Sequence, residues 1–200
     1  MFSSYDEFQV TVGEYLQRNN LADKIPGFIQ LAEVRFRDEF NDFPQQKAAP
    51  YTLTPAAGTN VIALPSDCAA ISLVMYGNHH LRLISLADVN NRNTQQDAYM
   101  FAEDGNNLYL QTATDGQKTL TIYYFAELDS LSSLNQSNWL LEEYPNIYLF
   151  ATLAEAAQYL MDVDLIQLYE MRLQQALQSA SRNKKQKLLP TNTKLVRKLK

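Results

Sequence analysis

NWLLEEYPNIYLFATLAEAAQYLMDVDLIQLYEMRLQQAL, residues 138–177, is the longest helical pattern in this chain of 200 residues. One apolar face recurs at helical spacing and comprises Leu149, Leu153, Ala156, Ala157 and Leu160. Asp162 or Asp164 can cap a following helix. The apolar stripe of that helix comprises Leu165, Tyr169, Leu173, Ala176, Leu177 and Ala180. The stretch therefore predicts two consecutive helices, at 145–161 and 164–185.

The N-terminal segment carries a second pair of helical patterns. Ser4 and Glu7 form a capping box ahead of an apolar face, which comprises Phe8, Val12, Tyr15 and Leu16. Asn19 and Asn20 end this helix. The next helix begins near Asp23, with Pro26 in its first turn, where the missing N–H costs little. Its stripe stops before Pro44 and comprises Ile25, Ile29, Ala32, Phe36, Phe40 and Phe43. We expect a helical hairpin with one buried seam.

The character of the chain changes between residues 50 and 127, where Pro and Gly separate short β-rich runs. These runs span 61–64, 70–76, 81–84, 99–102, 107–112 and 118–126. Asp104-Gly105 and Asp115-Gly116 are hairpin signals between runs. Residues 86–96 are polar and suit either a short helix or a long loop.

These patterns predict an α+β fold. Helical hairpins from the N- and C-terminal segments pack as a bundle, with an inserted antiparallel β module and an extended basic C-terminal arm. We expect the bundle to comprise 1–48 and 138–187, the β module 50–127, a Ser-rich connector 128–137, and the arm 188–200. Trp139, the only Trp, is expected to anchor the helices to the β module, although it could also stack on bases or sugars.

The charges of the chain are segregated. Residues 182–200 carry eight basic side chains and no acid, whereas the other 181 residues carry 9 basic and 22 acidic ones, a balance of −13. No apolar run approaches the ~20 residues of a membrane span. The N-terminal sequence does not resemble a secretory signal, and the single cysteine excludes an internal disulfide. An intracellular setting without membrane attachment is therefore expected.

The sequence contains no recognisable catalytic constellation. Its six glycines are never closer than 11 residues, which rules out the Gly-rich loops that bind phosphates. His79 and His80 are adjacent, a spacing that disfavours chelation of one metal ion. Cys68 has no second Cys nearby and is typical of inert packing. We expect no enzyme activity, no metal and no cofactor.

The basic segment, residues 182–200, has three possible functions. It can neutralise nucleic-acid phosphates, bind an anionic membrane surface, or order against an acidic partner protein. Its charges alternate with apolar residues, which suits a protein groove better than phosphates alone: Leu188, Leu189, Leu195, Val196 and Leu199. A disordered solubilising tail is the simplest alternative.

Residues 123–177 resemble the C-terminal half of the head-to-tail adaptor proteins of tailed bacteriophages. The matching motifs keep the family's order: Tyr123-Tyr124, Leu131-Ser132, Asn138 to Leu141, Pro145 to Leu149, and Leu153 to Leu160. The sequence LPSD at 64–67, ahead of a strand, matches as well. The resemblance covers most of residues 60–180 and rests on several moderate motifs.

This resemblance implies a structural virion protein without catalysis. Such adaptors form a ring, usually of twelve copies, beneath the portal at the capsid vertex, and offer a surface to tail or nozzle proteins. DNA passes through the ring without specific binding, and assembly takes place in the host cytoplasm. The runner-up function is a nucleic-acid-binding accessory protein that acts through the basic segment.

The resemblance also implies two sets of contact residues. The C-terminal arm would extend onto the portal through Lys184, Lys185, Lys187, Leu188, Leu189, Lys194, Leu195, Arg197 and Lys198. A ring of helices side by side requires small or apolar residues on more than one helical face. The helix at 145–161 offers a second such face for the lateral contact, with Tyr148, Thr152, Ala156 and Tyr159.

Overall fold

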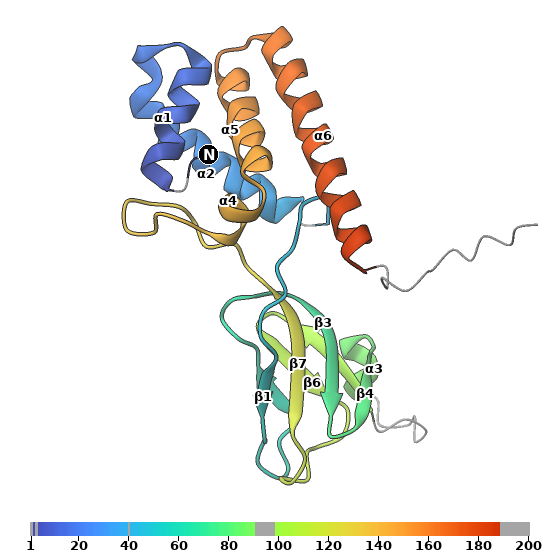
Figure 1. The fold of residues 1–200 in the computed structure, drawn as a ribbon. Helices are drawn as coiled ribbons and strands as arrows, with labels where there is room; N and C mark the ends of the chain where they lie inside the picture. The colour runs from blue at the N-terminus through green and yellow to red at the C-terminus, as the bar shows by residue number, and fades with distance from the viewer. Residues whose placement is uncertain (1, 3, 40, 91–98, 189–200) are drawn as a thin grey trace, which may run out of the picture. The chain divides into compact units, whose positions relative to one another are not determined.

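A computed structural model describes residues 2, 4–39, 41–90 and 99–188. The chain divides into two compact units: residues 1–44 with 128–200, and residues 45–127 (Figure 1). Among the described residues, the first unit contains helices and no strand, and the second contains the strands and one short helix, so we call them the helical unit and the β unit. The α+β class expected from the sequence is confirmed.

The helical unit contains six helical segments within the described residues. They are α1 (Tyr5–Leu16), the 3₁₀ helix η1 (Asn19–Lys24), α2 (Ile25–Asp38), α4 (Trp139–Glu143), α5 (Pro145–Tyr159) and α6 (Val163–Leu188). The predicted cap at Ser4 is confirmed, because its Oγ accepts the Glu7 N–H at 3.3 Å. Asp162, one of the two predicted candidates, accepts the Leu165 N–H at 3.2 Å.

Two predicted helix ends are wrong. Asp23 does not cap α2, because η1 runs through it and α2 begins directly at Ile25. The helix also ends at Asp38, before Pro44, and the chain then turns so that Phe43 packs on Phe36 with ring centroids 4.8 Å apart. Phe40, predicted on the same stripe, lies outside the described residues.

Helix α5 lies at the centre of the helical unit. It packs against α1, α2, α4 and α6 (Figure 1). Its alanines make this possible, because small side chains let neighbouring backbones approach on several sides. Four of them have no exposed surface: Ala151, Ala154, Ala156 and Ala157. A helix that is apolar all round is typically a buried one, and α5 follows that rule.

The β unit is one curled sheet of seven strands in the order β1-β7-β3-β4-β5-β6-β2. The strands are β1 (Tyr51–Leu53), β2 (Val61–Ala63), β3 (Cys68–Tyr76), β4 (His79–Leu83), β5 (Met100–Asp104), β6 (Asn107–Leu110) and β7 (Leu120–Ala126). The expectation of a purely antiparallel module is wrong at one pair, because β4 and β5 run parallel. Parallel neighbours require a long crossover, and residues 84–99 supply it.

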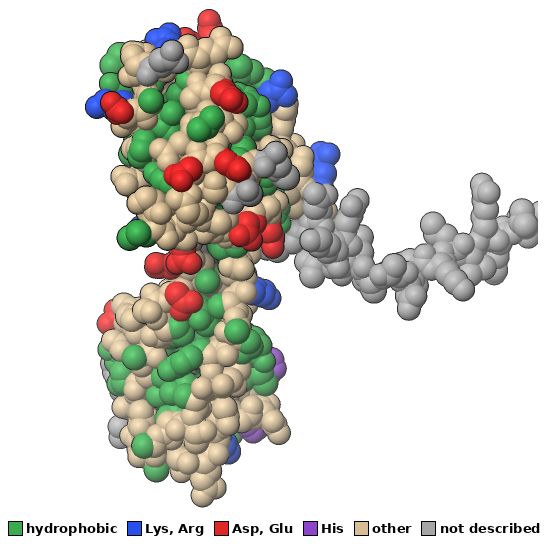
Figure 2. Space-filling view, turned by 60° about the vertical axis from the view of Figure 1, so that its left-hand side comes forward, with side chains coloured by type: hydrophobic (Ala, Val, Ile, Leu, Met, Phe, Trp, Pro, Cys, Tyr) green, Lys and Arg blue, Asp and Glu red, His purple; other side chains and the backbone are tan. Residues whose placement is uncertain are grey.

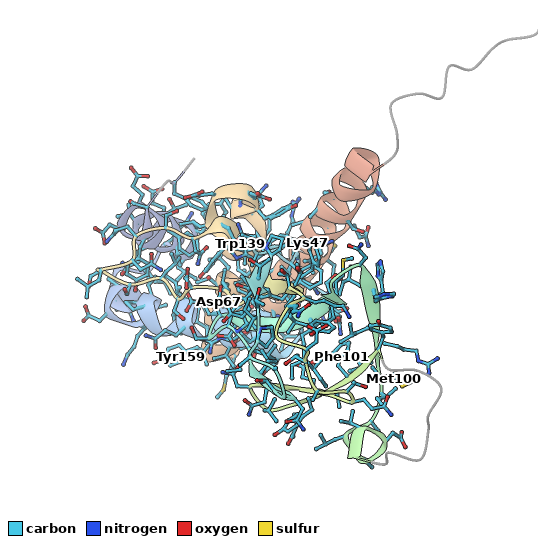
Figure 3. The ribbon with its side chains drawn as sticks, turned by 90° about the horizontal axis from the view of Figure 1, so that it is seen from below. Lys47, Asp67, Met100, Phe101, Trp139 and Tyr159 are labelled. Carbon is cyan, nitrogen blue, oxygen red and sulfur yellow. The ribbon has the colours of Figure 1, made fainter. Side chains whose placement is uncertain are left out.

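Part of that crossover is α3 (Leu86–Asn90), which packs against β5 and β6. Its presence explains why adjacent residues of β5 are both buried, although they face opposite sides of the strand. Met100 and Phe101, labelled in Figure 3, are only 8% and 4% exposed. Phe101 belongs to the core enclosed by the sheet, whereas Met100 does not. Of the two options for residues 86–96, a short helix or a long loop, the short helix is present over residues 86–90. Residues 91–98 lie outside the described part of the chain.

One of the two predicted hairpins is confirmed. Asp104 pairs with Asn107 across a two-residue turn in which Gly105 has φ +57°. The prediction at Asp115-Gly116 is wrong, because the strands on either side, β6 and β7, are not neighbours in the sheet. Gly116 instead belongs to a long connection, where its φ is +75°.

Replacing Gly116 with alanine should destabilise the β unit by about 2 kcal/mol or more. A Cβ there would lie 3.0 Å from the Ala57 backbone nitrogen, and the positive φ adds strain. Gly105→Ala is the matched control, because its φ is also positive but nothing lies within 4 Å of the added Cβ. Chemical denaturation of both variants, followed by far-UV circular dichroism, measures the difference. Equal losses would contradict the steric argument.

Candidate functional site

Three of the four residues predicted to form the lateral contact of a ring are buried inside the helical unit. Tyr148, Thr152 and Ala156 have no exposed surface, because α5 is surrounded by the other helices of its own chain. This burial does not fit the role predicted for them, since none can reach a second copy. Tyr159, at the end of α5 and labelled in Figure 3, is 56% exposed and remains available.

Tyr148 instead organises the interior. Its ring packs edge-on against Phe8 of α1 and Phe36 of α2, with centroids 5.3 and 5.1 Å away. Its hydroxyl donates a hydrogen bond of 2.5 Å to Glu33, which is only 2% exposed. Burial and the nearby Glu33 carboxylate together raise the pKa of Tyr148 well above its usual range. Tyr148 is therefore a structural residue that joins three helices.

Glu33 also fixes the connector. The same Oε1 that accepts the Tyr148 hydroxyl accepts the backbone N–H of Leu131 at 2.7 Å. Asn138 also holds the connector in place. Its Oδ1 caps α4 by accepting the Leu141 N–H, and its Nδ2 donates to the Asp129 carbonyl at 2.7 Å. The sequence patterns alone did not predict the buried Glu33 carboxylate. The one sequence signal for it is the position of Glu33 on the apolar stripe of α2, between Ile29 and Phe36.

The turn between α5 and α6 presents apolar side chains to solvent. Tyr159, Met161 and Val163 are 56%, 86% and 63% exposed. Met161 adopts a left-handed conformation, φ +55°, and two backbone hydrogen bonds close a Schellman motif: Met161 N–H to Gln158 and Asp162 N–H to Ala157. Glycine is the usual residue at such a position, because a Cβ disfavours the left-handed conformation. An exposed methionine there therefore adopts a backbone conformation that its own side chain disfavours.

A shallow groove of about 390 Å³ lies between α2 and α6, with α5 as its floor. Arg35 of α2 spans it and forms a bidentate ion pair with Glu170 of α6, at 2.7 and 3.1 Å. The lining is otherwise acidic, polar or apolar: Leu31, Val34, Asp38, Glu39, Glu155 and Gln158. The hydrogen bond to Glu170 raises the pKa of Arg35 further above its already high range, so the guanidinium is permanently charged.

The β unit has a smaller pocket of about 220 Å³, where Tyr76, Asp115 and Lys118 meet. Their polar groups satisfy one another: the Tyr76 hydroxyl donates to Asp115 at 2.6 Å, and Lys118 pairs with the same carboxylate at 3.1 Å. These contacts hold the pKa of Asp115 well below its usual range. The cluster stabilises the connection between β6 and β7.

The residues weighed for metal or nucleophilic chemistry lie apart. His79 and His80 are exposed on β4, and His79 stacks on Tyr99 with centroids 4.1 Å apart. Burial, followed by nearby carboxylates, raises the pKa of the Cys68 thiol to about 11. Within the described part of the chain, no three His, Cys, Asp or Glu residues are grouped to hold a metal ion.

The predicted arm falls largely beyond the described region. Lys184, Lys185, Lys187 and Leu188 belong to the last turns of α6, where the backbone alone is described. Leu189, Lys194, Leu195, Arg197 and Lys198 lie outside the described residues. Among the helices that are described, none is both long and apolar enough to cross a membrane.

Exposed apolar residues at one turn and a charged groove between two helices suit a protein that works through contacts with other proteins. Comparison with known families gives the class: a bacteriophage adaptor protein. The chain belongs to the SU10 adaptor protein family, whose sequence model matches residues 3–194. This confirms the resemblance to phage adaptors. No curated protein sequence matches the chain.

Proposed function

We propose that this adaptor joins the portal vertex of a phage capsid to its tail by forming a ring, of twelve copies, around the DNA channel. The observation that carries the proposal is the family match over residues 3–194, nearly the whole chain. The ring lies in the neck of the virion, binds the portal on one side, and offers a surface to a tail or nozzle protein on the other. DNA leaves through it during ejection.

The lateral contact of this ring is assigned to the α5–α6 turn, with Tyr159, Met161 and Val163. Of the side chains first considered for this role, Tyr159 alone is exposed. The left-handed Met161 supports the assignment, because residues that break a local rule cluster at functional surfaces. Figure 2 shows one face of the helical unit, on which hydrophobic and acidic side chains are interspersed.

Met161→Gly tests this assignment. The variant should gain about 0.5–1 kcal/mol of stability, because glycine relieves the left-handed strain. It should also assemble on the portal about tenfold more weakly, because the apolar side chain is gone. Gln17→Gly is the control, since Gln17 is the other described non-glycine with positive φ, at 50°. Trp139 fluorescence measures stability and sedimentation measures assembly. Normal assembly of M161G would place the lateral contact elsewhere.

The C-terminal arm, 188–200, is the segment proposed to bind the portal. Its charges and leucines suit a groove with acidic and apolar walls, and the residues proposed for docking are Lys184, Lys185, Lys187, Leu188, Leu189, Lys194, Leu195, Arg197 and Lys198. The rest of the chain, with its balance of −13, would repel the phosphates of passing DNA, so the DNA slides without specific binding. A ring with a basic lumen would contradict this point.

Electron microscopy of the chain mixed with its cognate portal tests the proposal. The expected result is an added ring beneath the portal, with twelvefold symmetry in class averages. Portal particles that look the same with and without the chain would overturn the proposal.

The basic segment also favours a second candidate, a nucleic-acid-binding accessory protein. Eight basic residues within 182–200 would neutralise phosphates, and affinity would then fall steeply with salt, by about 0.9 logarithmic unit per phosphate contact for each tenfold rise in salt. DNA titrations at several salt concentrations separate the candidates. A portal adaptor should bind DNA barely at all under any of these conditions.

A further inference from the structure

The groove between α2 and α6 is short of positive charge. Among the described residues that line it, Arg35 is the one cation, and it is shared by three carboxylates. It lies 2.7 Å from Glu170, 3.2 Å from Glu39 and 4.0 Å from Glu155. Asp38 adds a fourth acid to the lining. The groove therefore carries a net negative charge even with Arg35 in place.

Glu155 is the least exposed of the three acids that pair with Arg35, and its contact is the longest. Its side chain is only 15% exposed, and within the described part of the chain its sole ion pair is the 4.0 Å contact with Arg35. Burial raises its pKa, and Arg35 only partly opposes that effect. A second cation beside this carboxylate would stabilise its ionised form.

The α2 wall of the groove carries two exposed apolar side chains beside its charged ones. Leu31 and Val34 are 52% and 47% exposed, and both line the groove. They are three residues apart and so lie on the same face of the helix. A matching ligand must therefore combine cations, for acids that lie on all three helices, with branched apolar side chains for Leu31 and Val34.

We propose that this groove binds the end of the same chain, residues 194–200, KLVRKLK. This segment provides four cations, Lys194, Arg197, Lys198 and Lys200, with Leu195, Val196 and Leu199 between them. The combination matches the groove in both charge and apolar character. The C-terminal arm is thus docked on its own helical unit before it meets any other partner.

The length of the chain permits this docking within one molecule. Glu170 lies 18 residues before the end of α6 at Leu188, a distance of about 27 Å along the helix. The ten residues from Leu188 to Lys198 span up to about 33 Å when extended. Pro190 cannot continue the helix, so a reversal directly after α6 agrees with the sequence.

Tethering favours the chain's own groove over that of a second copy. A short linker gives the arm a millimolar effective concentration at the groove, far above the concentration of free protein in a dilute sample. Self-docking would compete with every other partner of the arm. It does not depend on the proposed function, because it requires only residues of this chain.

Carbodiimide cross-linking of the full chain at low micromolar concentration tests the proposal, since it joins Lys to Asp or Glu that form ion pairs. The expected products, in the monomer band, join Lys194 or Lys198 to Glu155 or Asp38. Asp6 and Glu14, exposed acids on α1 of the same unit, are the control. Cross-links that reach these acids equally, that occur only in dimers, or that avoid the groove would overturn the proposal.

A second measurement uses the full chain with Lys194→Gln, Arg197→Gln and Lys198→Gln. A labelled peptide of residues 189–200 should bind this variant about tenfold or more tightly than the native chain, whose groove is already occupied. Adding Glu155→Gln to the variant should remove most of that binding. Equal affinity of the peptide for the native chain and the triple variant would overturn the proposal.

Discussion

Replacing Glu33 with alanine is expected to destabilise the helical unit by about 3–5 kcal/mol. The Glu33 carboxylate accepts the Tyr148 hydroxyl and the Leu131 N–H in a buried site, and alanine would leave both donors without that acceptor. It would also leave a cavity where α2 meets α5. Trp139, the single Trp, belongs to the helical unit, so its fluorescence during chemical denaturation reports this unit specifically.

Two matched variants separate the causes of that loss. Glu33→Gln keeps an Oε1 acceptor for both donors and should lose about 1–2 kcal/mol. Glu33→Leu fills the volume but accepts nothing, so it should behave like the alanine variant. If leucine were as stable as the native chain, the hydrogen bonds would contribute little and the network would matter only for packing.

Ending the chain at Leu188 is expected to weaken assembly on the portal by about 3 kcal/mol or more, roughly a hundredfold. The truncation removes four cations and four apolar residues of the proposed arm, Leu189, Leu195, Val196 and Leu199, but no described part of either unit. Stability measured through Trp139 should fall by only about 1.4 kcal/mol, the contribution of a tenfold self-docking of the arm, which is less than half of the expected loss in assembly. Co-sedimentation with the portal measures the loss.

The control for charge alone is a chain with Arg18→Gln and Lys24→Gln, two exposed cations of the helical unit outside the arm. This variant should assemble as the native chain does. Rings that form normally without residues 189–200 would refute the role of the arm, although the chain could still be an adaptor. A similar loss in both variants would indicate that net charge is responsible, not the arm.

Local patterns were enough to predict most helices. The faces of α1, α5 and α6 follow a period that depends only on neighbouring residues, and Ser4 and one of the two candidate Asp caps mark helix starts through their own side chains. The hairpin at Gly105 is equally local, since a tight turn requires a positive φ. The family resemblance likewise rested on motifs in continuous sequence.

Periodicity could not tell which neighbour covers an apolar face. The second face of α5, with Tyr148, Thr152 and Ala156, was assigned to another copy of the chain, yet it packs inside the same molecule. Small and apolar residues look alike in both situations. The acid at position 33 was the available clue, because a buried carboxylate requires partners from elsewhere in the fold.

The order of the strands in the sheet could not be predicted from local patterns either. The parallel pairing of β4 with β5 depends on a crossover through α3, and the separation of β6 from β7 depends on the whole sheet. The short strand β1, residues 51–53, carries too few residues for an alternating pattern. The groove around Arg35 was missed for the same reason, because its two ion-pair partners on α5 and α6 are more than a hundred residues away in sequence.

The discontinuity of the helical unit sets an order of events during synthesis. Residues 45–127 leave the ribosome as one continuous stretch, so the β unit can fold before any of α4, α5 or α6 has been made. Helices α1 and α2 must wait, because their apolar faces are covered by α5 and the Tyr5 N–H bonds the Gln136 carbonyl at 2.6 Å. Nascent chains stalled before residue 145 should therefore recruit chaperones through α1 and α2.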